Sequence, residues 1–185
     1  MTKGWYRMKR LVQGLVISML ALLAFSVPAF ASEPPTSEPA PDILVRQIMG
    51  LAYESQQTIN SVPFAVGDSL KKVIKKWGPP EDMSTVAANY WSRNIRFIYD
   101  GSTGRKTIVA IEDFDPKLQS IHLSDVKGLI GNPDSEQELE GNYFVTYSDG
   151  ENYTVTFVFQ SAFSNPNPSL EMYILEKPGL ELKQK

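Results

Sequence analysis

The chain of 185 residues contains no cysteine and only one histidine, His122. Without cysteine it can form no disulfide and carry no lipid on a thiol, so the fold has to rest on a hydrophobic core. One histidine is too few for a usual metal centre, which gathers several nitrogen or sulfur ligands. A Ser-His-Asp triad needs only one, but no serine stands in a nucleophile-elbow context. We therefore interpret His122 as structural and predict neither a metal nor another cofactor.

Positive charge is also scarce once the first 31 residues are set aside. Those residues hold four of the 18 lysines and arginines and none of the 21 aspartates and glutamates. The rest of the chain has 14 basic against 21 acidic residues, a formal charge of −7. Nucleic-acid-binding domains concentrate positive charge on one face. We therefore predict no nucleic-acid partner, and no attraction to an anionic membrane after export.

The N-terminal segment has the order of a secretory signal. Basic residues at positions 3, 7, 9 and 10 precede an apolar run from Leu11 to Val27, and Ala29-Phe30-Ala31 offers small residues for cleavage. This run is shorter than the roughly 20 residues that a membrane-spanning helix needs. We predict a signal peptide over residues 1–31, cut after Ala31, and a secreted or cell-envelope location. The alternative is an uncleaved signal that anchors the chain.

The remaining sequence divides into a linker and one domain. Residues 32–41 are rich in proline, serine and glutamate, which predicts a disordered segment. Residues 42–185 have the length of a single domain. Apolar residues recur at helical spacing after Asp42, the expected N-cap, and this pattern fades near Asn60.

Two shorter helices are expected further along, each ended by a glycine and a proline. One runs from Ser69 to Gly78, and its lysines at positions 71, 72, 75 and 76 lie opposite an apolar stripe. An anion-binding role for these lysines is possible, but such a stripe is usually the solvated outer face of a helix. The other helix starts at Ser124 and stops at Gly131.

Apolar residues alternate with polar ones in six segments, which predicts strands. The alternation is clearest in the last hairpin, where one face is apolar and the other carries threonines. The predicted strands are residues 90–91, 96–99, 107–114, 142–147, 152–160 and 170–175, and the apolar hairpin face is Tyr143, Val145, Tyr147, Tyr153, Val155, Phe157 and Phe159.

The domain repeats part of its own pattern at a constant offset of 53 residues. The matches are Leu70, Val73, Trp77, Gly78 and Pro80 with Leu123, Val126, Ile130, Gly131 and Pro133, and Asn89-Tyr90-Trp91 with Asn142-Tyr143-Phe144. A repeat of this length indicates two copies of one unit. We predict an α+β fold with two units of a helix plus three strands, at about 61–116 and 120–178. They would join into one continuous antiparallel sheet with helices on one face.

Ser61-Val62-Pro63-Phe64, Lys76-Trp77-Gly78-Pro79-Pro80 and Asn89-Tyr90-Trp91 carry a family resemblance. Together they are similar to the YjgB-like family of exported proteins of Gram-positive bacteria, which carry a domain of unknown function. The twice-repeated helix turn also resembles the tandem modules typified by the β-lactamase inhibitor protein. The likeness implies an α+β fold and an extracytoplasmic location, and it brings no catalytic residues.

An enzymatic site is the least favoured of three hypotheses. Glu112, Asp113 and Asp115 form the densest acidic group, and paired carboxylates can perform acid–base hydrolysis. If residues 107–114 form a strand, however, Glu112 and Asp113 point to opposite faces. We therefore predict a protein without catalytic residues.

Aromatic residues offer the leading hypothesis, a binding module. In both units two neighbouring aromatics occupy a strand, so one of each pair has to leave the face that the helices cover. Exposed aromatics on a sheet face are typical of surfaces that bind partners. We predict that Trp91, Phe144 and Arg96 bind a protein or peptide. The second hypothesis is an envelope-associated structural or assembly protein, retained by an uncleaved signal.

Overall fold

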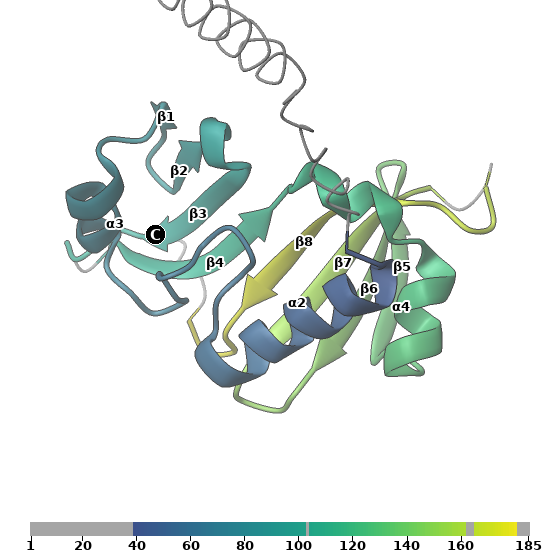
Figure 1. Cartoon of the computed structure of the whole chain (residues 1–185). Helices are drawn as coiled ribbons and strands as arrows, with labels where there is room; N and C mark the ends of the chain where they lie inside the picture. Colours follow the sequence, from purple (N-terminus) through teal and green to yellow (C-terminus); the bar gives the residue numbers. More distant parts are fainter. Residues whose placement is uncertain (1–38, 103, 162–164, 181–185) are drawn as a thin grey trace, which may run out of the picture. The chain divides into compact units, whose positions relative to one another are not determined.

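The computed structural model describes residues 39–102, 104–161 and 165–180. Within them, one antiparallel sheet of eight strands packs against three α-helices, so the predicted α+β class is confirmed (Figure 1). The described residues belong to one compact unit. The predicted signal peptide and most of the predicted linker lie outside them. None of the helices in this part of the chain is long and apolar enough to cross a membrane.

The sheet consists of two runs of four consecutive strands that meet where β4 pairs with β8. Its order is β1 (Asp82–Met83), β2 (Ala87–Tyr90), β3 (Ile95–Asp100), β4 (Thr107–Asp113), β8 (Leu170–Glu176), β7 (Thr154–Gln160), β6 (Asn142–Ser148) and β5 (Ser135–Leu139).

Four strands, rather than the expected three, therefore follow each of the two short helices. The additional strands are β1 and β5, both at the edges of the sheet, and every residue of both is exposed. Without a buried face they lack the apolar alternation by which a strand is predicted. The predicted strand at residues 90–91 also ends earlier, because Trp91 begins a 3-10 helix.

The helices lie close to their predicted places. They are α2 (Pro41–Ser55), α3 (Leu70–Trp77) and α4 (Leu123–Ile130), with two short 3-10 helices, η1 (Trp91–Arg93) and η2 (Pro116–Ser120). In α2 the N-cap is Ala40 and not Asp42, because Pro41 already occupies the first turn. The helix ends at Ser55, ahead of Asn60, where Gln56 turns into the left-handed region with φ of 55° and bonds back to Ala52.

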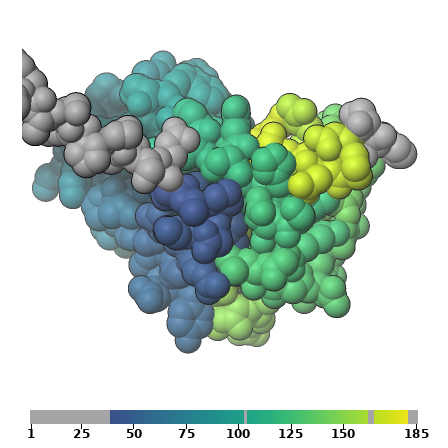
Figure 2. Space-filling view, turned by 45° about the vertical axis from the view of Figure 1, so that its right-hand side comes forward, coloured from purple at the N-terminus to yellow at the C-terminus, as the bar shows by residue number. Residues whose placement is uncertain are grey.

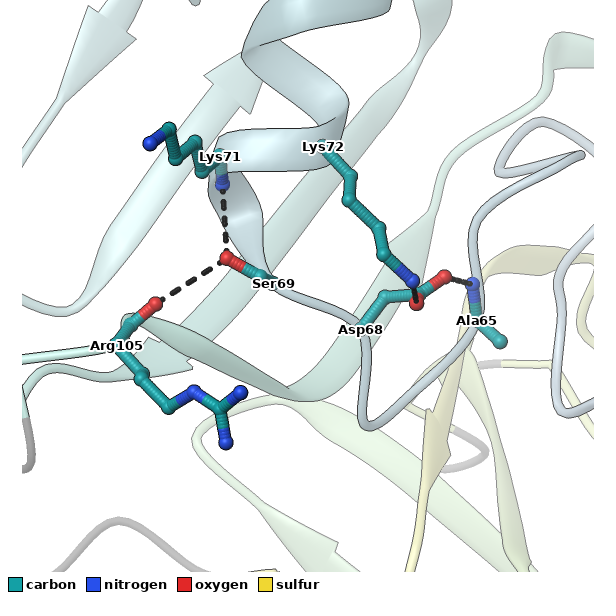
Figure 3. A network of polar contacts seen from close by, with 6 residues as sticks. All are labelled: Ala65, Asp68, Ser69, Lys71, Lys72 and Arg105. Carbon is teal, nitrogen blue, oxygen red and sulfur yellow. Dashed lines mark hydrogen bonds and ion pairs between the residues drawn. The ribbon is translucent and has the colours of Figure 1, made fainter.

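Polar contacts before α3 fasten its first turn (Figure 3). The Ser69 side chain accepts a hydrogen bond from the backbone of Lys71 at 3.3 Å and donates one to the Arg105 carbonyl at 3.3 Å. The carboxylate of Asp68 accepts from the Ala65 backbone and pairs with Lys72 at 2.5 Å. The four lysines of α3 are exposed, as expected for an outer face.

Helix α4 is also capped by a polar contact, and it begins one residue before its predicted start. His122 is its N-cap, and the His122 backbone N–H donates to the carboxylate of Asp125 at 2.8 Å. The His122 side chain is 45 % exposed. The sole histidine therefore lies at a helix end, as its structural interpretation predicts.

The core lies between one face of the sheet and the three helices. In the views of Figures 1 and 2, α2 and α4 lie side by side over the strands of the second run. The predicted apolar face of the β6–β7 hairpin is confirmed, with Tyr143 partly and the other six residues fully buried. Helix residues in the same core cluster include Leu44, Ile48, Leu70, Val73, Leu123 and Val126.

Candidate binding surface on the open face of the sheet

Among the described residues, no α-helix covers the other face of the sheet, which is called the open face here. Strand alternation assigns residues to it: Phe97 and Ile111 are in the core, so their neighbours Arg96 and Glu112 point the opposite way. Arg96 and Glu112 are directly opposite each other on β3 and β4. The open face therefore contains one of the predicted binding residues, Arg96.

Four side chains on adjacent strands form a bonded polar row across the first half of the open face. The Arg96 guanidinium pairs with Glu112 at 2.7 Å and donates from Nε to Asn89 at 2.8 Å. The Asn89 amide donates to Asp82 at 2.7 Å. Each member lies opposite the next in strand register, so the row is straight. Because every member bonds a neighbour, its donors and acceptors are held in place.

In strand register, the polar row continues onto the second half of the open face, where threonine hydroxyls replace the charged side chains. Glu112 lies opposite Ile174, and Ile174 lies opposite Thr156. Thr156 faces Thr146, and their hydroxyl oxygens are 3.1 Å apart. The open face thus has a charged half and a hydroxyl half, with Glu112 and Ile174 at the centre.

Trp91 lies beside the charged half. Its side chain is 46 % exposed, and its ring centroid is 6.0 Å from that of Phe114, with the planes 31° apart. The Arg96 guanidinium lies over both rings, 5.3 Å from the centroid of Trp91 and 5.7 Å from that of Phe114. The structure therefore brings Trp91 and Arg96 together, with Phe114 as a third member that the sequence interpretation missed.

Phe144 lies on the same face but further away. It is opposite Val158 on β7, and Val158 is opposite Met172 on β8, which makes an apolar row next to the polar row. Asp113 on β4 pairs with Tyr173 on β8. Because the strands are antiparallel, Phe114, one position after Asp113, lies next to Met172, one position before Tyr173. The described contacts join Phe144 to neither Trp91 nor Arg96, but the apolar row leads from one aromatic group to the other.

A hollow of about 680 Å³ opens on the same face, over β3, β4 and β8. A register shift between Ile98 and Tyr99 leaves Val109 as an extra residue on β4, so that Val109 and Ala110 both line it. No local pattern predicts this hollow, because it is assembled from distant segments. Its lining is Ile98, Val109, Ala110, Glu112, Thr154, Ile174, Glu176, Lys177, Pro178 and Leu180.

The three acidic residues considered for hydrolysis do not share a cleft. Glu112 is on the open face with Arg96, whereas Asp113 is fully buried on the core side, as the alternation predicts. Asp115 instead caps η2 by accepting a hydrogen bond from the Lys117 backbone at 3.0 Å. Burial raises the pKa of both Glu112 and Asp113, against the attraction of Arg96 in the first case and hydrogen bonds from Asn60 in the second.

The described residues also contain no group of side chains that could bind a metal ion. Across residues 39–102, 104–161 and 165–180, no three histidine, aspartate or glutamate side chains are grouped so that they could hold an ion. Chemically, the open face offers aromatic rings, a fixed row of donors and acceptors, and a hollow with both apolar and charged lining residues.

Comparison with known proteins gives one match. The family model described as "Domain of unknown function (DUF4309)" matches residues 45–175. No curated protein and no solved structure matches the chain. The matched range begins in α2 and ends in β8, and so includes both halves of the sheet and the open face. The chain therefore belongs to the DUF4309 family, a domain of unknown function.

Proposed function

We propose that the protein is an exported, non-catalytic binding module that holds a protein or peptide on the open face of its sheet. The observation that carries this proposal is the cluster of Trp91, Phe114 and Arg96. Trp91 is 46 % exposed and lies with Phe114 under Arg96, and exposed aromatic patches of this kind mark interaction surfaces. Tryptophan and arginine are also the residues in which binding energy tends to concentrate.

A protein or peptide partner suits this surface better than a small ligand alone. The polar row supplies side-chain donors and acceptors in a line across the sheet, and aromatic rings flank it. The hollow beyond Ile98 and Ala110 has a mixed lining, six apolar residues with Glu112, Thr154, Glu176 and Lys177, that suits one side chain of a partner. Binding there would bury the aromatic edge and place polar groups against the row.

The proposal includes the tandem repeat, with units near 61–116 and 120–178 and the likeness to YjgB-like proteins and β-lactamase-inhibitor-type modules. Two matching hydrogen bonds support it: the Tyr90 hydroxyl donates to the Gly78 carbonyl at 2.9 Å, and Tyr147 donates to that of Gly131 at 3.0 Å. The offset of 53 pairs Tyr90 with Tyr143, yet Tyr147 makes the corresponding bond.

The backbone around the two short helices supports the repeat independently. Both glycines have positive φ, 88° at Gly78 and 98° at Gly131, and each ends its helix by bonding back to the last turn. The residues before the helices, Ser69 and His122, both form an isolated antiparallel bridge at the start of the last strand of their own half, to Thr107 in β4 and to Ser169 just before β8. Such repeated detail is what two copies of one unit would retain.

Export rests on the signal-like N-terminus. The proposed mature chain starts at Ser32, and the competing possibility is a chain that keeps its apolar segment as an anchor. N-terminal sequencing of the protein recovered from culture medium distinguishes them: a start at Ser32 supports export with cleavage, and an intact Met1 favours the anchored envelope protein.

The binding surface is tested by the double substitution Trp91→Ser and Phe144→Ser in the mature chain. Both residues are at least partly exposed on the open face, so the thermal midpoint should stay within a few degrees of wild type. Capture of a partner from culture medium and cell-wall extract by the immobilised domain should be abolished. Circular dichroism melts and quantitative mass spectrometry of the captured proteins provide the two measurements.

The matched control is Tyr53→Ser, which removes an exposed aromatic from α2 on the helix-covered side. Capture that is lost in the double variant and kept in Tyr53→Ser supports the open face. Equal capture by all three proteins, or unfolding of the double variant, contradicts the proposal, because Trp91 and Phe144 would then be irrelevant to binding or part of the core.

A further inference from the structure

A second hollow, of about 370 Å³, lies on the helix-covered side of the molecule, away from the open face. It is formed by the second half of α2, the end of α4, the segment before β5 and the β6–β7 turn. We name it the aromatic hollow, because three tyrosines, Tyr53, Tyr147 and Tyr153, are among its lining residues. Figures 1 and 2 show α2 next to α4, and both helices contribute lining residues to the aromatic hollow.

The rings of Tyr53 and Tyr153 meet edge to face rather than in a parallel stack. The rings of Tyr53 and Tyr153 have centroids 6.5 Å apart and meet at 84°. Tyr53 is 70 % exposed although it belongs to a helix that buries its other face, whereas Tyr153 is only 8 % exposed. Tyr147 is held in place by its hydrogen bond to the Gly131 carbonyl. The exposed ring of Tyr53 is therefore the aromatic surface that remains open to a bound group, and Tyr153 packs against it.

The charge of the aromatic hollow is negative. Asp134 and Asp149 line it, and its lining includes no lysine or arginine. Both carboxylates are positioned by hydrogen bonds, Asp134 from the Ser148 backbone at 2.7 Å and Asp149 from the Asn152 amide at 3.1 Å. The face of an aromatic ring attracts cations through its quadrupole. Rings and carboxylates therefore favour the same kind of ligand.

The hydroxyls of Tyr147 and Tyr153 stay neutral in this environment. Burial, with Glu136 and Asp134 nearby, raises the pKa of Tyr147 to about 12, and burial with Asp149 raises the pKa of Tyr153. Both shifts are in the direction that neighbouring negative charge produces. At physiological pH these two side chains are therefore neutral, and the charge that attracts a ligand is that of the carboxylates.

We propose that the aromatic hollow binds a small organic cation of the alkylammonium class, with its ammonium head against the exposed ring of Tyr53 and near Asp149 and Asp134. The volume is at the lower end of the range for ligand pockets, which suits a compact head group. A hard metal ion would need a cage of six or more oxygen ligands, whereas an alkylammonium group can use the ring surfaces directly. This inference is independent of the function proposed for the open face.

The test is titration of the mature chain with choline chloride at low ionic strength, followed by calorimetry and by NMR shifts of the tyrosine rings. Parallel titrations use butylammonium, a primary amine, and 3,3-dimethylbutan-1-ol, the uncharged shape analogue of choline. Choline should bind saturably and the alcohol about tenfold more weakly or worse, since it has lost its charge. Tighter binding of choline than of butylammonium assigns a quaternary head, and the reverse assigns a primary amine.

Substitutions locate the binding. Tyr53→Ala should weaken choline binding about fivefold or more, on the scale of one lost cation–π contact, and Tyr53→Phe should retain it because the ring remains. Asp149→Asn should also weaken binding, and added salt should reduce the wild-type affinity. Trp91→Ala, which removes an exposed aromatic on the open face, should leave it unchanged. Absence of saturation with both cations, equal binding of the alcohol, or an unchanged affinity in Tyr53→Ala overturns the proposal.

Discussion

At the scale of single residues, Asp113 is the most consequential charged group of the core. Its carboxylate accepts hydrogen bonds from the backbone and side chain of Asn60, at 2.8 and 2.9 Å, and from Tyr173 at 3.3 Å. The Tyr173 hydroxyl in turn accepts from the Ile59 backbone at 2.7 Å. A buried carboxylate with several donors thus fastens the loop after α2 to the centre of the sheet, where β4 and β8 pair.

The pH dependence of stability tests this arrangement. Burial raises the pKa of Asp113 above its ordinary 3.8, so the folded carboxyl binds a proton more tightly than the unfolded one. The resulting contribution to the free energy of unfolding grows as pH falls through the raised pKa, and is complete below 3.8. Urea melts at a series of pH values from neutral down to 3.8 should show wild type gaining stability relative to Asp113→Asn as the pH falls.

Two further comparisons separate charge from hydrogen bonding. At neutral pH, Asp113→Asn should cost about 1–3 kcal/mol, because one acceptor oxygen becomes a donor that faces other donors. Tyr173→Phe keeps the carboxylate and should keep the pH dependence, while losing about 1 kcal/mol. If the difference between wild type and Asp113→Asn does not change with pH, the carboxyl is not shifted in the folded protein.

At the scale of elements, the ends of α3 and α4 are held by the same kind of hydrogen bond, from a tyrosine hydroxyl to a glycine carbonyl. In each case a glycine with positive φ ends the helix and exposes its carbonyl to a tyrosine of a strand, Gly78 to Tyr90 and Gly131 to Tyr147. A glycine reaches this conformation without the steric cost that a Cβ brings. Each short helix is thereby joined to its own half of the sheet as well as packed on it.

Removing the two hydroxyls should have matching effects. Tyr90→Phe and Tyr147→Phe should each lower the free energy of unfolding by about 0.5–1.5 kcal/mol, the usual net value of one hydrogen bond, measured by urea denaturation. Tyr143→Phe is the control, because its hydroxyl bonds the exposed side chain of Glu136 and should contribute less. A large effect of Tyr143→Phe with none of Tyr147→Phe would instead support the strict offset of 53 residues.

At the scale of the whole molecule, the pairing of β4 with β8 makes one sheet out of two runs of strands. Core residues from both runs belong to a single cluster, and α2 and the loop after it contribute to that cluster. Neither half has a core of its own in this arrangement. We therefore expect the domain to unfold as one cooperative unit.

The placement of tryptophan allows a direct measurement. After removal of residues 1–31 the only tryptophans are Trp77 and Trp91, both in the first half, whereas far-ultraviolet circular dichroism reports the entire sheet. The fluorescence and dichroism transitions in urea should therefore coincide. Trp91→Phe leaves Trp77, which packs against Phe64 and Tyr90, as a core reporter and should give the same result. A fluorescence midpoint at lower urea would show that the first half unfolds alone.

Much of the local structure follows from short-range patterns in the sequence. Glycine and proline after Trp77 and Ile130 end the helices, because proline cannot continue them and glycine reaches positive φ freely. The core face of the β6–β7 hairpin follows from strict alternation between Tyr143 and Phe159. The opposite orientations of Glu112 and Asp113 follow from the same period of two.

Both edge strands and the two hollows could not be predicted in this way. The edge strands β1 and β5 lack a buried face, and the hollow on the open face depends on one extra residue, Val109, and on a segment after β8. The stack of Trp91 on Phe114 joins residues that follow two different strands, and the meeting of Tyr53 with Tyr153 joins a helix to a hairpin 100 residues away.

By itself, the sequence determined the α+β class, the ends of α3 and α4 and the face that each long strand buries, because backbone conformation and side-chain period act over a few neighbouring residues. Tertiary structure alone decided the pairing of β4 with β8 and the grouping of side chains on the open face and in the aromatic hollow. Those features depend on register between distant strands and on helix placement, for which no local pattern carries the information.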